Sequence, residues 1–268
     1  MTAVLLVLAL AASAAPDIHV DEDGFVTITE DSLEQRRDQH CMQLMKEAEE
    51  YYNNGDYEDI SLAIEKYERV FNSGGELAEN VHLSILYRLS MLYQRYASDG
   101  SWQNKGNADS LWADWKEISK TGNIPDEFIQ HALTIVKSPE YKEALTQAIT
   151  CNNEAIALLQ DNGGIRLARL YFTNADLCER VGDRCGKHER IINYIQARQT
   201  AREVIRSGGE GKPEAKNISR MALKNTLLLL QREWDVALAS QLLQDYREDH
   251  DLFSSIQQIL QSKDKTEE

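Results

Sequence analysis

The stretch "LMKEAEEYYNNGDYEDISLAIEKYERVFNSGG", residues 44–75, determines how the rest of the chain is interpreted. On both sides of the segment "NNGD", residues 53–56, apolar and small residues recur every three or four positions. This spacing is typical of a helix with one buried face. Asparagine, glycine and aspartate favour turns and end helices. The stretch therefore predicts two helices joined by a tight turn, which is a helical hairpin.

The same alternation of helical segments and turns continues along the chain. From Ser32 onward we expect helices over about 33–52, 57–72 and 77–96, and further ones to residue 261. Only 4 Pro and 14 Gly occur in 268 residues, fewer turn residues than an all-β protein needs. Strand-like alternation is confined to "FVTIT", residues 25–29. We predict an all-α fold, an array of antiparallel helical hairpins with about ten or eleven helices.

The first residues, "MTAVLLVLALAASAAPD", indicate a targeting segment. An apolar run over residues 3–12 has the length of a signal-peptide core, and Ala12-Ser13-Ala14 offers a small-residue cleavage site. We expect a signal peptide over residues 1–14, an acidic leader over 15–31, a helical-repeat domain over 32–262 and a disordered tail over 263–268. No later stretch is long and apolar enough to span a membrane, so the mature chain is expected in the ER lumen or outside the cell.

The charge balance narrows the classes of partner. The chain has 29 Lys and Arg against 44 Asp and Glu, a formal net charge of -15. Binding to nucleic acid needs clustered Lys and Arg, and an anionic membrane surface repels such a chain. We therefore expect no nucleic-acid partner and no membrane insertion after signal cleavage.

Four cysteines, an even number in an exported chain, predict disulfides. The four are Cys41, Cys151, Cys178 and Cys185. Cys178 and Cys185 flank the turn "ERVGDR", which favours a local bond between them and leaves Cys41 for Cys151. A zinc site of Cys178, Cys185 and His188 is the alternative, but an oxidising compartment favours the disulfide. Asn217-Ile218-Ser219 is a glycosylation acceptor, which predicts a surface position for Asn217.

Residues 44–75 resemble a tetratricopeptide repeat. The matching positions are Leu44, Ala48 and Tyr51 in the first helix, Gly55, Asp56 and Tyr57 in the turn, and Ala63 and Tyr67 in the second helix. Three extra residues precede Ala63, and Gly75 stands where the family usually has a proline. The array is thus similar to a divergent tetratricopeptide repeat protein. Another α-solenoid, such as an armadillo-like one, and an irregular helical bundle are the alternatives.

The resemblance implies binding of a protein or peptide on a concave face built from the first helices of the hairpins. The candidate residues on that face are Tyr52, Arg88, Gln94, Arg95, Asn174 and Arg180. No motif with catalytic geometry is visible, so we predict a non-enzymatic scaffold or co-chaperone-like adaptor of the secretory pathway, with no cofactor and no metal. The alternative is a helical carrier that holds a lipid or another small apolar ligand. The sequence does not assign an oligomeric state.

Overall fold

The computed structural model describes residues 18–20, 26–28, 30–54, 57–73, 79–99, 134–159, 164–186, 188–208, 211–233 and 235–264. These residues form nine α-helices, a further helical segment over 134–137, one 3-10 turn and a two-stranded antiparallel sheet. The elements are β1 (Ile18–Val20), β2 (Val26–Ile28), α1 (Glu30–Asn54), α2 (Tyr57–Phe71), α3 (Glu79–Asp99), α6 (Pro139–Leu159), α7 (Gly164–Val181), η2 (Gly182–Arg184), α8 (Glu189–Ser207), α9 (Lys212–Glu233), α10 (Val236–Asp245) and α11 (His250–Asp264). The predicted all-α array is confirmed, with one small β-hairpin in front of it.

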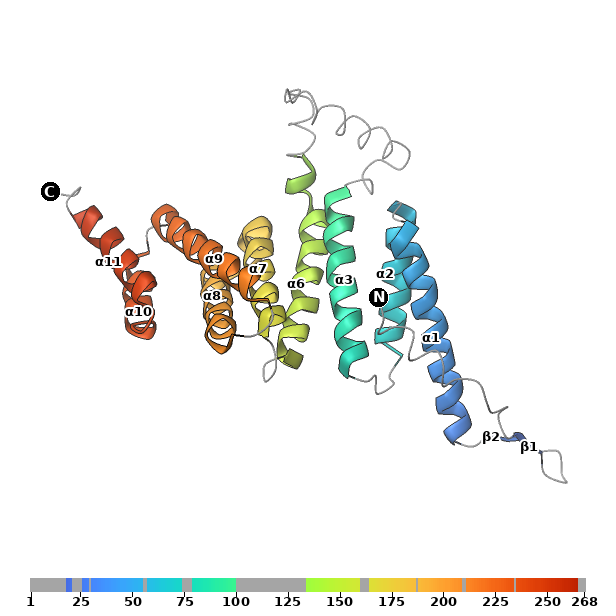
Figure 1. Ribbon diagram of the computed structural model, residues 1–268. Helices are drawn as coiled ribbons and strands as arrows, with labels where there is room; N and C mark the ends of the chain where they lie inside the picture. The colour runs from blue at the N-terminus through green and yellow to red at the C-terminus, as the bar shows by residue number, and fades with distance from the viewer. Residues whose placement is uncertain are drawn as a thin grey trace.

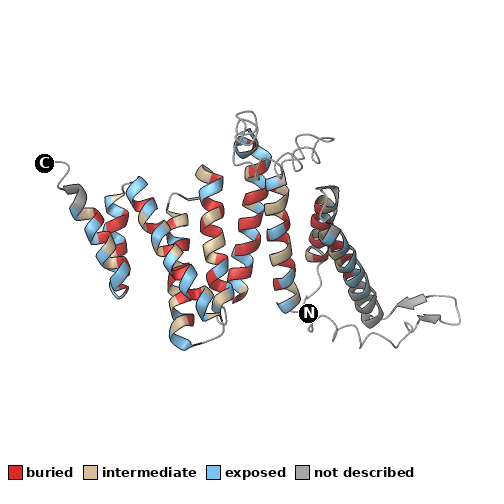
Figure 2. Ribbon diagram, turned by 45° about the horizontal axis from the view of Figure 1, so that its top comes forward, coloured by how far each residue is buried: buried red, intermediate tan, exposed pale blue. Residues whose placement is uncertain are grey.

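The helices stand in a row, with α1 and α2 at one end and α10 and α11 at the other (Figure 1). Each helix from α1 to α9 packs on the next one along this row, and α3 packs on α6 although residues 100–138 separate them in the sequence. α11 closes the row by packing on α9. Buried residues form stripes on the sides of the helices that face their neighbours (Figure 2). The molecule is therefore elongated, and its core is a series of contacts between neighbouring helices.

The element boundaries agree with the sequence to within a few residues. α1 begins at Glu30, two residues before the expected domain boundary, and α11 ends at Asp264, two residues into the expected tail. The Ser-Pro-Glu signal starts α6, where the Ser138 hydroxyl accepts a hydrogen bond of 3.1 Å from the Tyr141 N–H. Gly208 ends α8 with a φ of 71°, a conformation that favours glycine. The expected signal peptide (1–14) and residues 265–268 of the tail lie outside the described residues.

The hairpins α1–α2 and α7–α8 share one polar contact. In the first, the Tyr67 hydroxyl donates a 2.6 Å hydrogen bond to Glu49, 18 residues earlier. In the second, the Tyr194 hydroxyl donates to Asp176, again 18 residues earlier. Both tyrosines are almost fully buried, with exposed fractions of 1% and 0%. Ala48 and Ala175, each one residue before the carboxylate, are completely buried. The two hairpins thus share one tyrosine–carboxylate contact at the same sequence separation.

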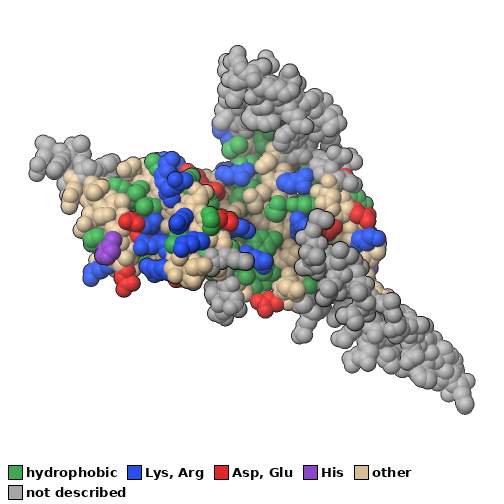
Figure 3. Space-filling model, in the orientation of Figure 1, with side chains coloured by type: hydrophobic (Ala, Val, Ile, Leu, Met, Phe, Trp, Pro, Cys, Tyr) green, Lys and Arg blue, Asp and Glu red, His purple; other side chains and the backbone are tan. Residues whose placement is uncertain are grey.

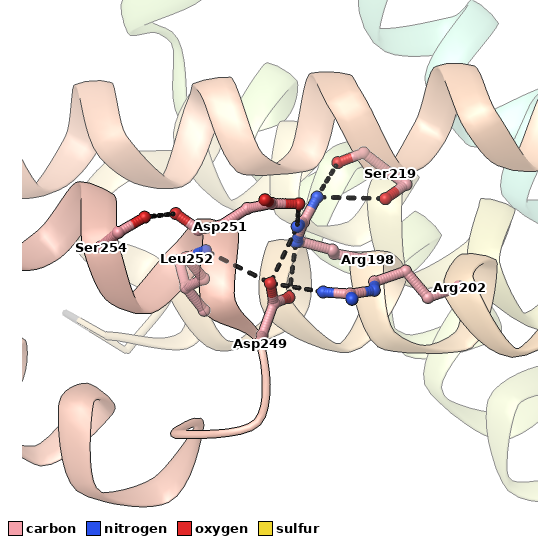
Figure 4. A network of polar contacts seen from close by, with 7 residues as sticks. All are labelled: Arg198, Arg202, Ser219, Asp249, Asp251, Leu252 and Ser254. Carbon is pink, nitrogen blue, oxygen red and sulfur yellow. Dashed lines mark hydrogen bonds and ion pairs between the residues drawn. The ribbon is translucent and has the colours of Figure 1, made fainter.

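A buried polar network attaches the last helix to the rest of the array (Figure 4). Arg198 of α8 donates to both carboxylate oxygens of Asp249, at 2.7 and 2.9 Å, and to Asp251 at 3.0 Å. It also donates to the backbone oxygen and the hydroxyl of Ser219 on α9, both at 3.1 Å. Arg202 forms a second ion pair with Asp249. One guanidinium thus joins α8, α9 and the start of α11.

Candidate functional site

Three of the six predicted binding residues lie together on neighbouring helices. Tyr52 is near the end of α1, and Arg88 and Arg95 are two turns apart on α3. Seven residues make nearly two helical turns, so the two arginines share one face of α3. The side chain of Tyr52 meets this face. We call Tyr52, Arg88, Met91 and Arg95 the Tyr52 cluster.

Cation–π contacts hold the cluster together. The Arg88 guanidinium carbon lies 4.4 Å from the centroid of the Tyr52 ring, and that of Arg95 lies 5.5 Å from it. Both distances are within the range in which a cation is attracted to an aromatic face. Arg95 also donates a 3.3 Å hydrogen bond to the backbone oxygen of Tyr52. The tyrosine ring is therefore bracketed by two positive charges.

Glu49 links the cluster to the buried Tyr67. Its carboxylate accepts a 3.0 Å hydrogen bond from Arg88 and a 2.6 Å hydrogen bond from the buried Tyr67 hydroxyl. Burial and this hydrogen bond to the carboxylate raise the pKa of Tyr67 well above its usual range, so the phenol keeps its proton. Arg88 is thus fixed in position by α1 and α2.

Met91 gives the cluster an exposed apolar part. It lies between Arg88 and Arg95 in sequence, its side chain is 46% exposed, and its sulfur is 3.9 Å from the Tyr52 hydroxyl. Methionine adapts its shape to irregular apolar partners. The cluster can accordingly contact a partner through an apolar group that lies beside an aromatic ring and two arginines.

The other three predicted residues do not join the Tyr52 cluster. Gln94 is half-buried and donates to the backbone oxygen and hydroxyl of Ser90 on its own helix, both at 3.2 Å. Arg180 is exposed on α7 but reaches across to α6, where it donates a 2.9 Å hydrogen bond to the Tyr141 hydroxyl. It belongs to a separate contact between those two helices.

Asn174 is a correction to the sequence prediction. It is 0% exposed, so it is unavailable to a partner on any face. Its side chain accepts a 2.8 Å hydrogen bond from Asn152 and donates one of 2.7 Å to Asn153. A buried amide needs such partners, and here two consecutive asparagines of α6 supply them. A polar residue in the helical pattern therefore belongs to the α6–α7 contact.

The cysteines follow the sequence prediction only in part. Cys178 and Cys185 form the expected local disulfide. The expected bond between Cys41 and Cys151 is absent, because both are free buried thiols. Cys41 lies 3.3 Å from the Ser73 hydroxyl at the end of α2, whereas Cys151 is on α6, which packs on α3. Burial raises the pKa of Cys151 to about 12, so it stays a neutral thiol.

The zinc alternative is not supported by the geometry around the disulfide. Within the part of the chain that the structure describes, one group of side chains could hold a metal ion: Cys178, Cys185 and Glu189. Both sulfurs of this group are bonded to each other in the disulfide. Glu189 accepts a 3.1 Å hydrogen bond from the Gly186 N–H. His188 points elsewhere, with its Nε2 3.0 Å from Asp235.

The glycosylation acceptor lies on the solvent side of α9. Asn217 is exposed, as the sequence predicts, and its side-chain oxygen accepts a 3.0 Å hydrogen bond from Arg220. Ser219, the third residue of the acceptor, is 7% exposed and bonded to Arg198. The folded chain therefore presents Asn217 but not its serine.

Sequence reasoning missed Glu49 and Met91, the two residues that complete the site. Glu49 lies one helical turn before Tyr52, which was a usable signal. The role of Met91 depends on the packing of α3 against α1, for which the sequence has no local signal.

Comparison with known proteins adds no further residue: no protein-family model matches the chain, and no curated protein is significantly similar to it. In the described ranges, no helix combines the length and the apolarity needed to cross a bilayer.

Proposed function

We propose that this chain is a non-enzymatic scaffold or adaptor of the secretory pathway that binds a protein or peptide through the Tyr52 cluster. The observation that carries the proposal is the bracketing of Tyr52 by Arg88 and Arg95, next to the exposed Met91. Aromatic and arginine side chains supply much of the binding energy at protein interfaces. Here they are held in place by contacts among three helices before a partner arrives.

The architecture supports the same proposal. A row of helices presents a long surface, and arrays of this kind suit extended partners. We further propose that α1–α2 and α7–α8 are copies of one repeat unit, related to the tetratricopeptide repeat that residues 44–75 resemble. The matched pairs Glu49–Tyr67 and Asp176–Tyr194 support common descent of the two hairpins.

The disulfide supports the proposed compartment. A cysteine pair bonded between Cys178 and Cys185 is compatible with a secreted or lumenal protein. The signal peptide over residues 1–14 is a part of the proposal that follows from the sequence.

A pull-down from secretory lumen and culture medium tests the proposal. The bait is the chain from residue 15 onward, compared with the double variant Met91→Ala, Arg95→Glu. Arg247→Glu, at an exposed arginine between α10 and α11, serves as the charge-matched control. We expect a specific protein that the control retains and the double variant loses. Retention of the protein by all three baits would reject the Tyr52 cluster as the binding site. Native mass spectrometry that finds a co-purifying lipid and no protein would reject the scaffold in favour of the carrier.

A further inference from the structure

The surface of α8 and α9 has a charge opposite to that of the chain as a whole. These two helices contain nine Lys and Arg and four Glu, a net charge of +5, in a chain of net charge -15. Lys and Arg side chains gather over α8 and α9 on the face shown in Figure 3. The region is therefore a basic island on an acidic molecule.

Three cations on the exposed side of α9 have no ion-pair partner among the described residues. Lys216, Arg220 and Lys224 follow one another at intervals of four residues and are all exposed. Within the described ranges none of them forms an ion pair, and Arg220 donates only to the neutral Asn217 side chain. Leu228, 52% exposed, continues the same side of the helix. We call Lys216, Arg220, Lys224 and Leu228 the α9 stripe.

Three arginines of this region have internal partners. Arg198 and Arg202 pair with Asp249, and Arg232 pairs with Glu179. The contrast matters because internal ion pairs explain those arginines, whereas nothing within the described chain explains the positive charge of the α9 stripe.

The chain itself contains a segment of the required chemistry. Residues 15–31 include six Asp and Glu and no Lys or Arg, and three of the acids are consecutive, Asp21, Glu22 and Asp23. Phe25, an apolar residue, follows two residues later. The segment cannot readily serve its own chain, because β1 and β2 lie beyond α1 at one end of the row, and α2, α3, α6, α7 and α8 separate that end from α9 (Figure 1).

We infer that the α9 stripe binds the acidic leader, residues 15–31, of a second copy of this chain. Such a contact joins the α1 end of one molecule to the α9 surface of the next. It is a heterologous contact, which forms rings or open chains of molecules and not a closed two-fold dimer. At physiological ionic strength charges are screened over about 8 Å, so the local attraction is not cancelled by the net negative charge of both copies.

Charge reversal in both halves of the contact tests this inference. We would measure sedimentation velocity of the chain from residue 15 onward, at increasing protein concentration and 0.15 M salt. The stripe variant is Arg220→Glu with Lys224→Glu, and the leader variant is Asp21→Lys with Asp23→Lys. Lys46→Glu with Arg247→Glu is the charge-matched control of the stripe variant, since both residues are exposed and lie outside α9.

The expected result is reversible self-association that the control retains and that each charge-reversed variant loses by about tenfold or more. An equimolar mixture of the two variants should associate again, because the reversed charges are complementary. This rescue also shows that both variants are folded. The inference is overturned if the native chain stays monomeric, if the stripe variant associates as well as the control, or if the stripe binds anionic phospholipid vesicles and not the leader. The Tyr52 cluster takes no part in this contact, so the outcome is independent of the proposed function.

Discussion

Arg198 and Asp249 are 51 residues apart in the sequence and are joined by two parallel hydrogen bonds, Nε to Oδ2 at 2.7 Å and the terminal nitrogen to Oδ1 at 2.9 Å. The Arg198 side chain is 5% exposed and that of Asp249 is 10% exposed. Asp249 also accepts a 3.2 Å hydrogen bond from the Leu252 N–H, so the same carboxylate caps α11. This buried ion pair therefore contributes to the attachment of the last helix, beside the buried Leu252 and Ile256.

Removal of the Asp249 carboxylate should destabilise the C-terminal part of the array. In Asp249→Ala the Arg198 guanidinium stays buried with only Asp251 and Ser219 as partners. Loss of one partner of a buried pair costs about 3 kcal/mol, which we expect in urea unfolding followed by circular dichroism. Asp251→Asn is the control, because that side chain is 72% exposed and its ion pair is worth less than about 1 kcal/mol.

The Asp249 carboxylate should make the free energy of unfolding depend on pH in the acid range. Burial alone would raise the pKa of Asp249, but hydrogen bonds from Arg198 and Arg202 hold it at about 2, below the ordinary value of 3.8. Because the pKa in the folded state is lower, the carboxylate stabilises the fold above pH 3.8, and the contribution is lost as the pH falls toward 2. Unfolding free energies at several pH values between 5 and 2 should fall more steeply for the native chain than for Asp249→Asn. Parallel curves would contradict the assignment.

The cysteine chemistry can be read by mass spectrometry. Alkylation of the native protein should modify neither Cys41 nor Cys151, because both thiols are buried and the pKa of Cys151 is raised to about 12. After unfolding without reductant, we expect these two cysteines to be modified and Cys178 and Cys185 to remain linked in one peptide pair. A peptide that links Cys41 to Cys151 would contradict the structure.

Tyr67 and Tyr194 should contribute similar amounts to the free energy of unfolding. Tyr67→Phe and Tyr194→Phe each remove one hydrogen bond to a carboxylate of the preceding helix, and each should cost about 1 kcal/mol of unfolding free energy. Tyr171→Phe is the control, because its hydroxyl forms no hydrogen bond with the described residues and its loss should cost less than about 0.5 kcal/mol. Strongly unequal values for Tyr67 and Tyr194 would argue against a common packing scheme.

Local patterns in the sequence sufficed for the helices. α2 was expected over 57–72 and is Tyr57–Phe71, because Asp56 and the glycines after Asn72 mark its ends by turn chemistry alone. The Cys178–Cys185 bond was also predictable, since a short turn brings its two ends together. These features depend on residues close in the chain.

Contacts between distant helices were not predictable in this way. Asn174 was expected on a binding face, but its amide is satisfied by Asn152 and Asn153, which become neighbours only when α6 packs on α7. Cys41 and Cys151 were paired by elimination, but they form no disulfide with each other. α1 packs on α2, whereas α6 packs on α3 and α7, and the sequence has no local signal for this difference. The contact of Tyr52 with Arg88 and Arg95 likewise exists only after α3 has packed beside α1.

Site-specific photocrosslinking tests the central claim most directly. A photoreactive amino acid replaces Met91, in the Tyr52 cluster, or Met42, which is also on the surface and has nearly the same exposed fraction, 44% against 46%. Each protein is illuminated in an extract of the secretory lumen. We predict a discrete protein adduct from position 91 that excess native chain suppresses and that Arg95→Glu weakens, with no such adduct from position 42. Equal adducts from both positions, or none from position 91, would contradict a partner bound at the Tyr52 cluster.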